Sequence, residues 1–292
     1  MLNAPIDDPQ LSLNNLWLGS KSAIPPQKVN HNDELIEILN GFHSHQLADL
    51  DKANLMDRVD VKFMLPMAFL PALLKQLQTY YSVLEINNNR ISEYYNQYFD
   101  TRNMDFYQHH HNGKLNRFKV RQRTYLDTDT RFLEVKFKNN RKRTLKTRIS
   151  CSDNAKSDDN CHHFIHQQMG TTFDNLVVSQ QSGYQRIALA NEASAERLTL
   201  DFNLWYQLAD ASKKVTPRGF FIAELKQHKR SKLSPFFQLM SKNSIYPAAF
   251  SKYCIGCALL YNNTLKTNQF KTVLRQIEKY SLSNHHPIQL SS

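Results

Sequence analysis

The sequence lacks the segments that would send a chain to or through a membrane. No basic stretch followed by an apolar stretch opens the chain, so we expect no signal peptide. No apolar run approaches the roughly 20 residues that a helix needs to span a bilayer. The 4 cysteines are too few for a disulfide-rich secreted scaffold. From these absences we expect a soluble, cytoplasmic protein.

The motifs of several common enzyme classes are also missing. The chain has no glycine-rich phosphate loop, no Gly-x-Ser-x-Gly and no His-Glu-x-x-His, so P-loop, serine-hydrolase and zinc-protease chemistry are unsupported. Cysteine and histidine gather at 161–166, and two further cysteines lie at 254 and 257. Neither group supplies the four ligands of a structural zinc site, so we expect ordinary side chains there.

The chain combines a globular composition with a large excess of positive charge. Hydrophobic residues make up 41% of its 292 residues, and the formal net charge is +11. From Lys114 to Arg148 there are thirteen lysines and arginines against three carboxylates, so this segment holds nearly all of the excess. Such a charge predicts an anionic partner, which could be nucleic acid, anionic lipid or a phosphorylated small molecule.

The basic segment also shows the alternation of a β-strand. Arg117, Lys119, Arg121 and Arg123 fall on one face of the run 117–125, because successive strand side chains point to opposite sides. The same pattern predicts strands at 58–63, 91–100, 131–138, 143–150, 184–190, 197–207 and 220–228. Helices are predicted at 32–45, 67–80, 162–169, 235–242 and 248–260, with a polar loop at 152–160. Like charges on neighbouring strands repel each other, so a bound polyanion would stabilise such a face.

We predict the α+β class, with eight antiparallel strands that close into a β-barrel and with flanking helices. The expected domain covers residues 31–262, after a polar N-terminal arm at 1–30 and before a polar C-terminal tail at 263–292. For any single strand, an ordinary sheet with a solvated polar face is the simpler interpretation.

The order of the motifs resembles that of a known family. The matching segments are Arg58-Val-Asp60-Val-Lys62, Tyr98-Phe99-Asp100-Thr101, Arg117 to Tyr125, Phe132-Leu-Glu134-Val-Lys136 and Ser251-Lys252-Tyr253. Together they look like the VTC domain, the catalytic domain of polyphosphate polymerases within the triphosphate tunnel metalloenzyme (CYTH-like) superfamily. The resemblance spans roughly residues 55–260. It implies a closed tunnel that binds a nucleoside triphosphate with Mn²⁺ or Mg²⁺.

The resemblance and the charged strand faces together give a set of candidate site residues. The catalytic candidates are Lys62, Arg121, Arg123 and Lys252. The substrate-binding candidates are Arg58, Arg117, Lys119, Lys136, Lys146, Arg148, Arg186, Arg197 and Lys226. Glu224 matches the metal-binding glutamate, and Glu134 is a second candidate ligand. Asp60 and Asp201 are expected to orient arginine and lysine side chains. An interior ion pair for Glu224 and a helix-surface place for Lys252 are the simpler alternatives.

The resemblance implies a metal-dependent polyphosphate polymerase that transfers the γ-phosphoryl group of ATP to a growing polyphosphate chain. The alternatives are a tripolyphosphatase or nucleoside triphosphatase of the same fold, or a non-catalytic regulator that binds polyphosphate or inositol polyphosphates. One departure favours the regulator, since polymerase relatives carry a lysine where this chain has Ala249. Nucleic acid is not expected, because the aromatic residues fall largely on the face opposite the cations. A membrane-protein partner could draw the product away in the cell.

Overall fold

The computed structural model describes residues 32–52, 59–141, 143–152, 155–170, 175–229 and 231–282. Arg58, the expected N-terminal arm and residues 283–292 lie outside these ranges. The chain divides into two compact units. Among the described residues, unit 1 comprises 97–123 and 130–179, and unit 2 comprises 32–96, 124–129 and 180–282.

The strands of the described ranges belong to one sheet of 11 strands. They are β1 (Ser44–His45), β2 (Val59–Pro66), β3 (Ser82–Leu84), β4 (Ser92–Asp100), β5 (Arg117–Tyr125), β6 (Thr130–Lys138), β7 (Thr144–Cys151), β8 (Val177–Asn191), β9 (Glu196–Gln207), β10 (Lys214–Val215) and β11 (Phe220–Gln227). Eight of them follow the order β2-β11-β9-β8-β4-β5-β6-β7, while β1, β3 and β10 pair off this path. Strand β11 is antiparallel to both β2 and β9, and β8–β9 and β6–β7 are antiparallel as well.

The predicted closed barrel is wrong. Across the described ranges, β2 and β7 stand at the two ends of the strand order, so the sheet is open. Alternation along a strand shows which face each side chain takes, but closure depends on pairing between the first and last strands, which alternation does not encode. Strand β7 has the character of an edge: its side chains are mostly exposed and include Lys146 and Arg148. Charged side chains of this kind commonly keep an edge strand unpaired.

Unit 1 contains helix α4 (Asp105–His111) and helix α5 (Ala155–Met169). The buried carboxylate of Asp100, which ends β4, accepts hydrogen bonds from the backbone N–H groups of Phe106 (2.9 Å) and Tyr107 (3.0 Å). Asp100 therefore satisfies donors at the start of α4 that have no partner within the helix. Helix α5 packs on β6 and β7, and Ile165 joins Leu133 in a buried apolar cluster.

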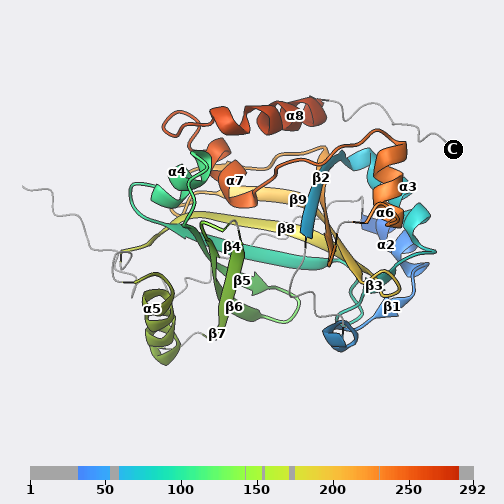
Figure 1. Ribbon diagram of the computed structural model, residues 1–292, viewed down its shortest axis with the longest axis horizontal. Helices are drawn as coiled ribbons and strands as arrows, with labels where there is room; N and C mark the ends of the chain where they lie inside the picture. The colour runs from blue at the N-terminus through green and yellow to red at the C-terminus, as the bar shows by residue number, and fades with distance from the viewer. Residues whose placement is uncertain are drawn as a thin grey trace, which may run out of the picture. The chain divides into compact units, whose positions relative to one another are not determined.

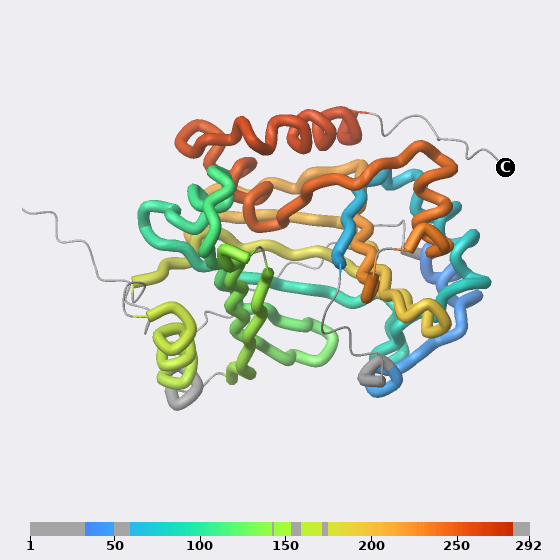
Figure 2. Tube along the Cα trace, viewed as in Figure 1, coloured from blue at the N-terminus to red at the C-terminus, as the bar shows by residue number. Residues whose placement is uncertain are grey.

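Unit 2 is built on an apolar core shared by strands β2, β8, β9 and β11 and three helices. The helices are α2 (Asn32–Asn40), α3 (Leu70–Leu77) and α6 (Pro235–Lys242), which gather beside one another in Figure 1. The buried face of α3 is a run of leucines at positions 70, 73, 74 and 77, which is the spacing of one helical face. Figure 2 shows the blue segment of α2 close to the orange segment of α6, so the core joins early and late parts of the sequence.

Two further helices, α7 (Lys252–Leu260) and α8 (Lys271–Leu282), complete unit 2. Helix α7 packs very closely on the sheet at Gly256. A Cβ atom there would lie 2.1 Å from Oε1 of Gln180 and 2.5 Å from the ring of Tyr206, so only glycine permits this approach. In the described part of the chain, no helix is both long and apolar enough to cross a membrane.

Candidate functional site

Most of the predicted site residues fall into two clusters, one within each unit. The unit 1 cluster consists of Arg121, Arg123, Glu134, Lys136 and Lys146. The unit 2 cluster consists of Lys62, Arg186, Asp201, Glu224, Lys226 and Lys252.

Four other substrate-binding candidates lie near these clusters on the same strands. The guanidinium of Arg117 donates to the carbonyl of Lys114 (2.6 Å), and that of Arg148 lies 4.6 Å from the centre of the Phe132 ring. Lys119 lies on β5 between Arg117 and Arg121. Arg197 on β9 is the register partner of Lys226.

The metal candidate of the unit 2 cluster, Glu224, is held only loosely by its neighbours. Register places Glu224 on β11 opposite Lys62 on β2. Its carboxylate lies 3.8 Å from Nζ of Lys62 and 3.2 Å from Nζ of Lys226, and its side chain is 18% exposed. Lys62 also donates to the carbonyl of Phe250 (3.1 Å), which ties β2 to the segment before α7. The Glu224 carboxylate can therefore accept a further cationic partner.

The second carboxylate of the unit 2 cluster, Asp201, is fully buried and tightly held. Nε and Nη2 of Arg186 donate to its two oxygens at 2.5 and 2.8 Å, and Nζ of Lys252 donates to Oδ2. The three side chains come from β9, β8 and the first position of α7. These contacts agree with the orienting role expected of Asp201.

The sequence reasoning missed two tyrosines that bracket these cations. The guanidinium of Arg186 lies 4.9 Å from the ring centre of Tyr94 and 5.3 Å from that of Tyr184. The two rings stack with centroids 5.0 Å apart, and Nζ of Lys252 lies 4.4 Å from the Tyr184 ring. One signal was available, because Tyr184 stands two residues before Arg186 and so shares its strand face.

The cations of the unit 2 cluster stabilise the ionised forms of its two carboxylates. Burial alone would raise the pKa of Glu224, but Lys226 and Lys62 outweigh it and hold that pKa well below its ordinary value. Burial likewise opposes ionisation of Asp201, yet Arg186 and Lys252 lower its pKa. Both carboxylates are therefore ionised near neutral pH. The pKa of Lys226 is lowered, chiefly by burial.

The carboxylate of the unit 1 cluster, Glu134, has both oxygens in contact with cations. Nε and Nη2 of Arg121 lie 2.6 and 2.5 Å from Oε2, and Nζ of Lys146 lies 2.6 Å from Oε1. The Glu134 side chain is 0% exposed. Burial raises its pKa, but Arg121, Arg123 and Lys146 together bring it well below the ordinary value. This geometry favours an orienting role for Glu134.

Positive charge in the unit 1 cluster exceeds what Glu134 can balance. Lys136 on β6 stands directly opposite Lys146 on β7. The pKa of Lys136 lies well below its ordinary value, most of all because of Arg121 and then because of burial. Burial is the main reason that the pKa of Lys146 is lowered too. An anion bound here would stabilise both ammonium groups.

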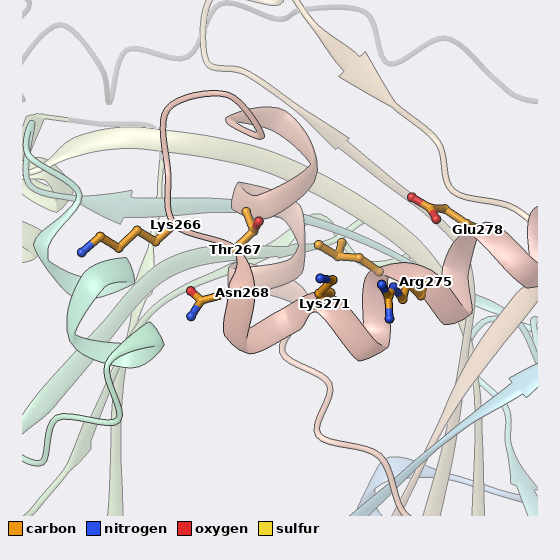
Figure 3. A pocket seen from close by; sticks show the side chains of 7 residues that line it. Lys266, Thr267, Asn268, Lys271, Arg275 and Glu278 are labelled. Atoms are coloured by element: carbon orange, nitrogen blue, oxygen red, sulfur yellow. The ribbon is translucent and has the colours of Figure 1, made fainter.

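A separate open groove lies in unit 2 where the 3₁₀ turn Asn268–Phe270 leads into α8 (Figure 3). It is lined by Lys266, Thr267, Asn268, Lys271, Leu274, Arg275 and Glu278. It contains none of the predicted site residues, and surface cations alone do not make a binding site.

Several solved structures match the chain at low sequence identity and low TM-score. A proposed adenylate cyclase from Vibrio parahaemolyticus is 17% identical with a TM-score of 0.41, over 68% of this chain and 97% of that one. A proposed adenylate cyclase from Bacillus halodurans is 13% identical with a TM-score of 0.45, over 67% and 96%. A proposed adenylyl cyclase from Hippeastrum, described as having a dominant triphosphatase activity, is 12% identical with a TM-score of 0.45, over 70% and 96%.

No curated protein matches the sequence. The VTC domain family, by contrast, matches residues 57–261, which is more than half of the chain and includes the described residues of both clusters. The resemblance seen in the sequence motifs is thereby confirmed, and the chain belongs to the VTC domain family.

Proposed function

We propose that the protein is a metal-dependent polyphosphate polymerase that transfers the γ-phosphoryl group of ATP to a growing polyphosphate chain. The observation that carries this proposal is the contrast between the two carboxylates of the unit 2 cluster. Asp201 is fully engaged with Arg186 and Lys252, whereas Glu224 has only loose ion pairs. One carboxylate thus holds cations in place while the other can receive a metal ion. Membership of the VTC domain family supports the same function.

The available ligands suit Mg²⁺ or Mn²⁺ held by one carboxylate together with substrate, rather than a metal ion enclosed by protein ligands alone. Among the described residues, no group of three or more histidines, cysteines, aspartates and glutamates comes together. Mg²⁺ commonly uses one or two carboxylates and completes its shell with substrate phosphates and water. Glu224 would hold the ion, which when bound would neutralise charge on the phosphate oxygens.

The cations of each cluster are suited to binding phosphate. Arginine presents a fork of donors to two oxygens, and lysine supplies a compact positive charge. In unit 2, Lys62, Lys226, Arg186 and Lys252 are assigned to phosphate binding. In unit 1, Arg121, Arg123, Lys136 and Lys146 are assigned to it as well. Fixed cations stabilise the negative charge of the transferring phosphoryl group.

The state of Glu134 favours transfer to phosphate over transfer to water. The terminal phosphate of a polyphosphate chain is already an oxyanion, so it needs no strong general base. A hydrolase must place a water molecule, and Glu134 was the other carboxylate near the cations that could do so. Its oxygens are engaged by Arg121 and Lys146, and its side chain is completely buried. A triphosphatase is therefore the second candidate, and a polyphosphate-binding regulator is the third because of Ala249.

The test is incubation of the purified protein with ATP and Mn²⁺ or Mg²⁺, with long-chain polyphosphate and free phosphate resolved separately. Polyphosphate together with ADP is the expected result. Free phosphate without polymer would replace the polymerase with a hydrolase, and tight tripolyphosphate binding with neither product would leave the regulator.

The variant Glu224→Gln tests the metal assignment within the same assay. Glutamine has the same shape but is a much weaker metal ligand, so we expect loss of metal-dependent turnover with the folded state retained. Glu85→Gln is the matched control, because Glu85 lies in the same unit and forms an ion pair with Arg90, which is not a member of the cluster. Unchanged turnover in Glu224→Gln would remove Glu224 from the mechanism.

A further inference from the structure

We propose that Asp201 is a positioning residue, which holds the cationic groups of Arg186 and Lys252 where they grip phosphate. The kinetic part of this inference rests on the proposed function, whereas its structural part can be tested without turnover. Asp201 itself would touch neither substrate nor metal, because both of its oxygens are engaged by these two side chains.

The three residues are brought together by separate elements. Register places Arg186 on β8 directly opposite Asp201 on β9, and Lys252 enters from the first position of α7. Arginine and lysine side chains occupy many rotamers when free. A single buried carboxylate that fixes both removes this freedom before substrate binds, and such preorganisation is a recognised source of rate enhancement.

Two aromatic rings also restrict the positions of the Arg186 guanidinium and the Lys252 ammonium. Tyr94 and Tyr184 lie over the guanidinium of Arg186, and Tyr184 also faces the ammonium of Lys252. The one carboxylate and the two rings together restrict where both cations can point.

This role predicts an unusual division between binding and turnover. Asp201 is a negative charge beside cations that bind a polyanion, so it weakens the attraction of the cluster for phosphate. In Asp201→Asn, tripolyphosphate affinity should stay equal or increase, and the KM for ATP should not rise. Loss of the held geometry should lower kcat, by roughly 10- to 100-fold. A merely structural role would instead impair binding and turnover together.

The experiment compares the full-length wild-type protein with Asp201→Asn, Asp201→Glu and the control Asp210→Asn, which loses the same charge in an exposed turn. Steady-state kcat and KM are measured with ATP, and affinity is measured by calorimetry with inorganic tripolyphosphate. Acylation of Lys252 by a small amine-reactive ester, followed by mass spectrometry, reports how firmly its ammonium is held.

We expect several-fold faster acylation of Lys252 in Asp201→Asn, and wild-type rates in Asp210→Asn. Asp201→Glu keeps the charge but moves it by one methylene, so acylation should stay slow while kcat falls. If Asp201→Asn does not fold, Asp201→Glu still tests the inference through kcat. If the wild type has no turnover, the proposed function fails, and acylation still decides whether Asp201 holds Lys252. Unchanged acylation in Asp201→Asn, or kcat at the wild-type value in both Asp201 variants, would overturn the inference.

Discussion

Replacement of Lys136 by methionine should make the free protein more stable and its phosphate binding weaker. Lys136 and Lys146 are direct cross-strand partners, and Arg121 is the largest cause of the lowered pKa of Lys136. Its surroundings therefore disfavour the charged form despite the presence of Glu134. Methionine matches the unbranched shape of the lysine stem and removes only the charge.

The size of the effect follows from Coulomb's law. Ammonium groups on opposed strand positions, about 6 Å apart, repel by about 3 kcal/mol at an effective dielectric constant of about 20. Side-chain freedom and the lost attraction to Glu134 reduce this value, so we expect a gain of about 1–2 kcal/mol in the free energy of unfolding. Because an ionic contact to phosphate is lost, tripolyphosphate affinity should fall by about tenfold, which corresponds to about 1.4 kcal/mol.

Urea denaturation at low ionic strength, with and without tripolyphosphate, measures both the gain in stability and the loss of tripolyphosphate affinity. Lys138→Met is the matched control, because Lys138 lies on the same strand opposite Thr144 rather than opposite a cation. The gain in stability should shrink as salt is added. If Lys136→Met proved less stable than the wild type while the control was unchanged, the view that like charges strain this cluster would be refuted.

Further predictions concern the same clusters and the position of Ala249. Glu134→Gln should destabilise the protein by about 3 kcal/mol, because it removes the buried carboxylate that pairs with Arg121 and Lys146; a loss below about 1 kcal/mol in urea denaturation would contradict these ion pairs. The pKa values of Lys136 and Lys226 are lowered in the folded protein. Between these lowered values and the ordinary lysine value of 10.5, the unfolded chain binds more protons than the folded protein, so the free energy of unfolding should rise with pH over this range. Tripolyphosphate binding should accordingly take up protons and weaken as pH rises, and equal binding heats in buffers of different ionisation enthalpy would count against this. Ala249→Lys, at an exposed position, should increase polymer formation without changing stability, and an unchanged product yield would show that the missing lysine does not limit the reaction.

Local patterns predicted the elements well, because each depends on neighbouring residues. The strand at 117–125 and the helix at 235–242 were predicted with the bounds that the structure has. Helix α5 begins at Ala155 rather than at 162, since its polar first turns look like a loop when no packing partner is known. Closure of the sheet was mispredicted for a related reason, because it depends on two strands far apart in the sequence.

The candidate site was predictable as a set of charges but not as a set of contacts. Alternation showed that Glu134, Glu224 and Asp201 each share a face with cations. It could not show that Asp201 and Glu134 are fully engaged while Glu224 is not, because that difference depends on register and on the entry of Lys252 from a helix. The residue roles that the pattern of charges alone left open came from the resemblance to the VTC domain, and they stay predictions.

Gly256 has a consequence well beyond its own contacts. It lies one turn after Lys252 in α7, at the point where the helix backbone rests on Gln180 and Tyr206. The missing side chain therefore sets the height of the helix above the sheet, and with it the reach of the lysine toward Asp201. A methyl group there would clash with Gln180 and the Tyr206 ring unless the helix or those side chains moved, so an apolar position with no charge of its own acts as the spacer of the unit 2 cluster.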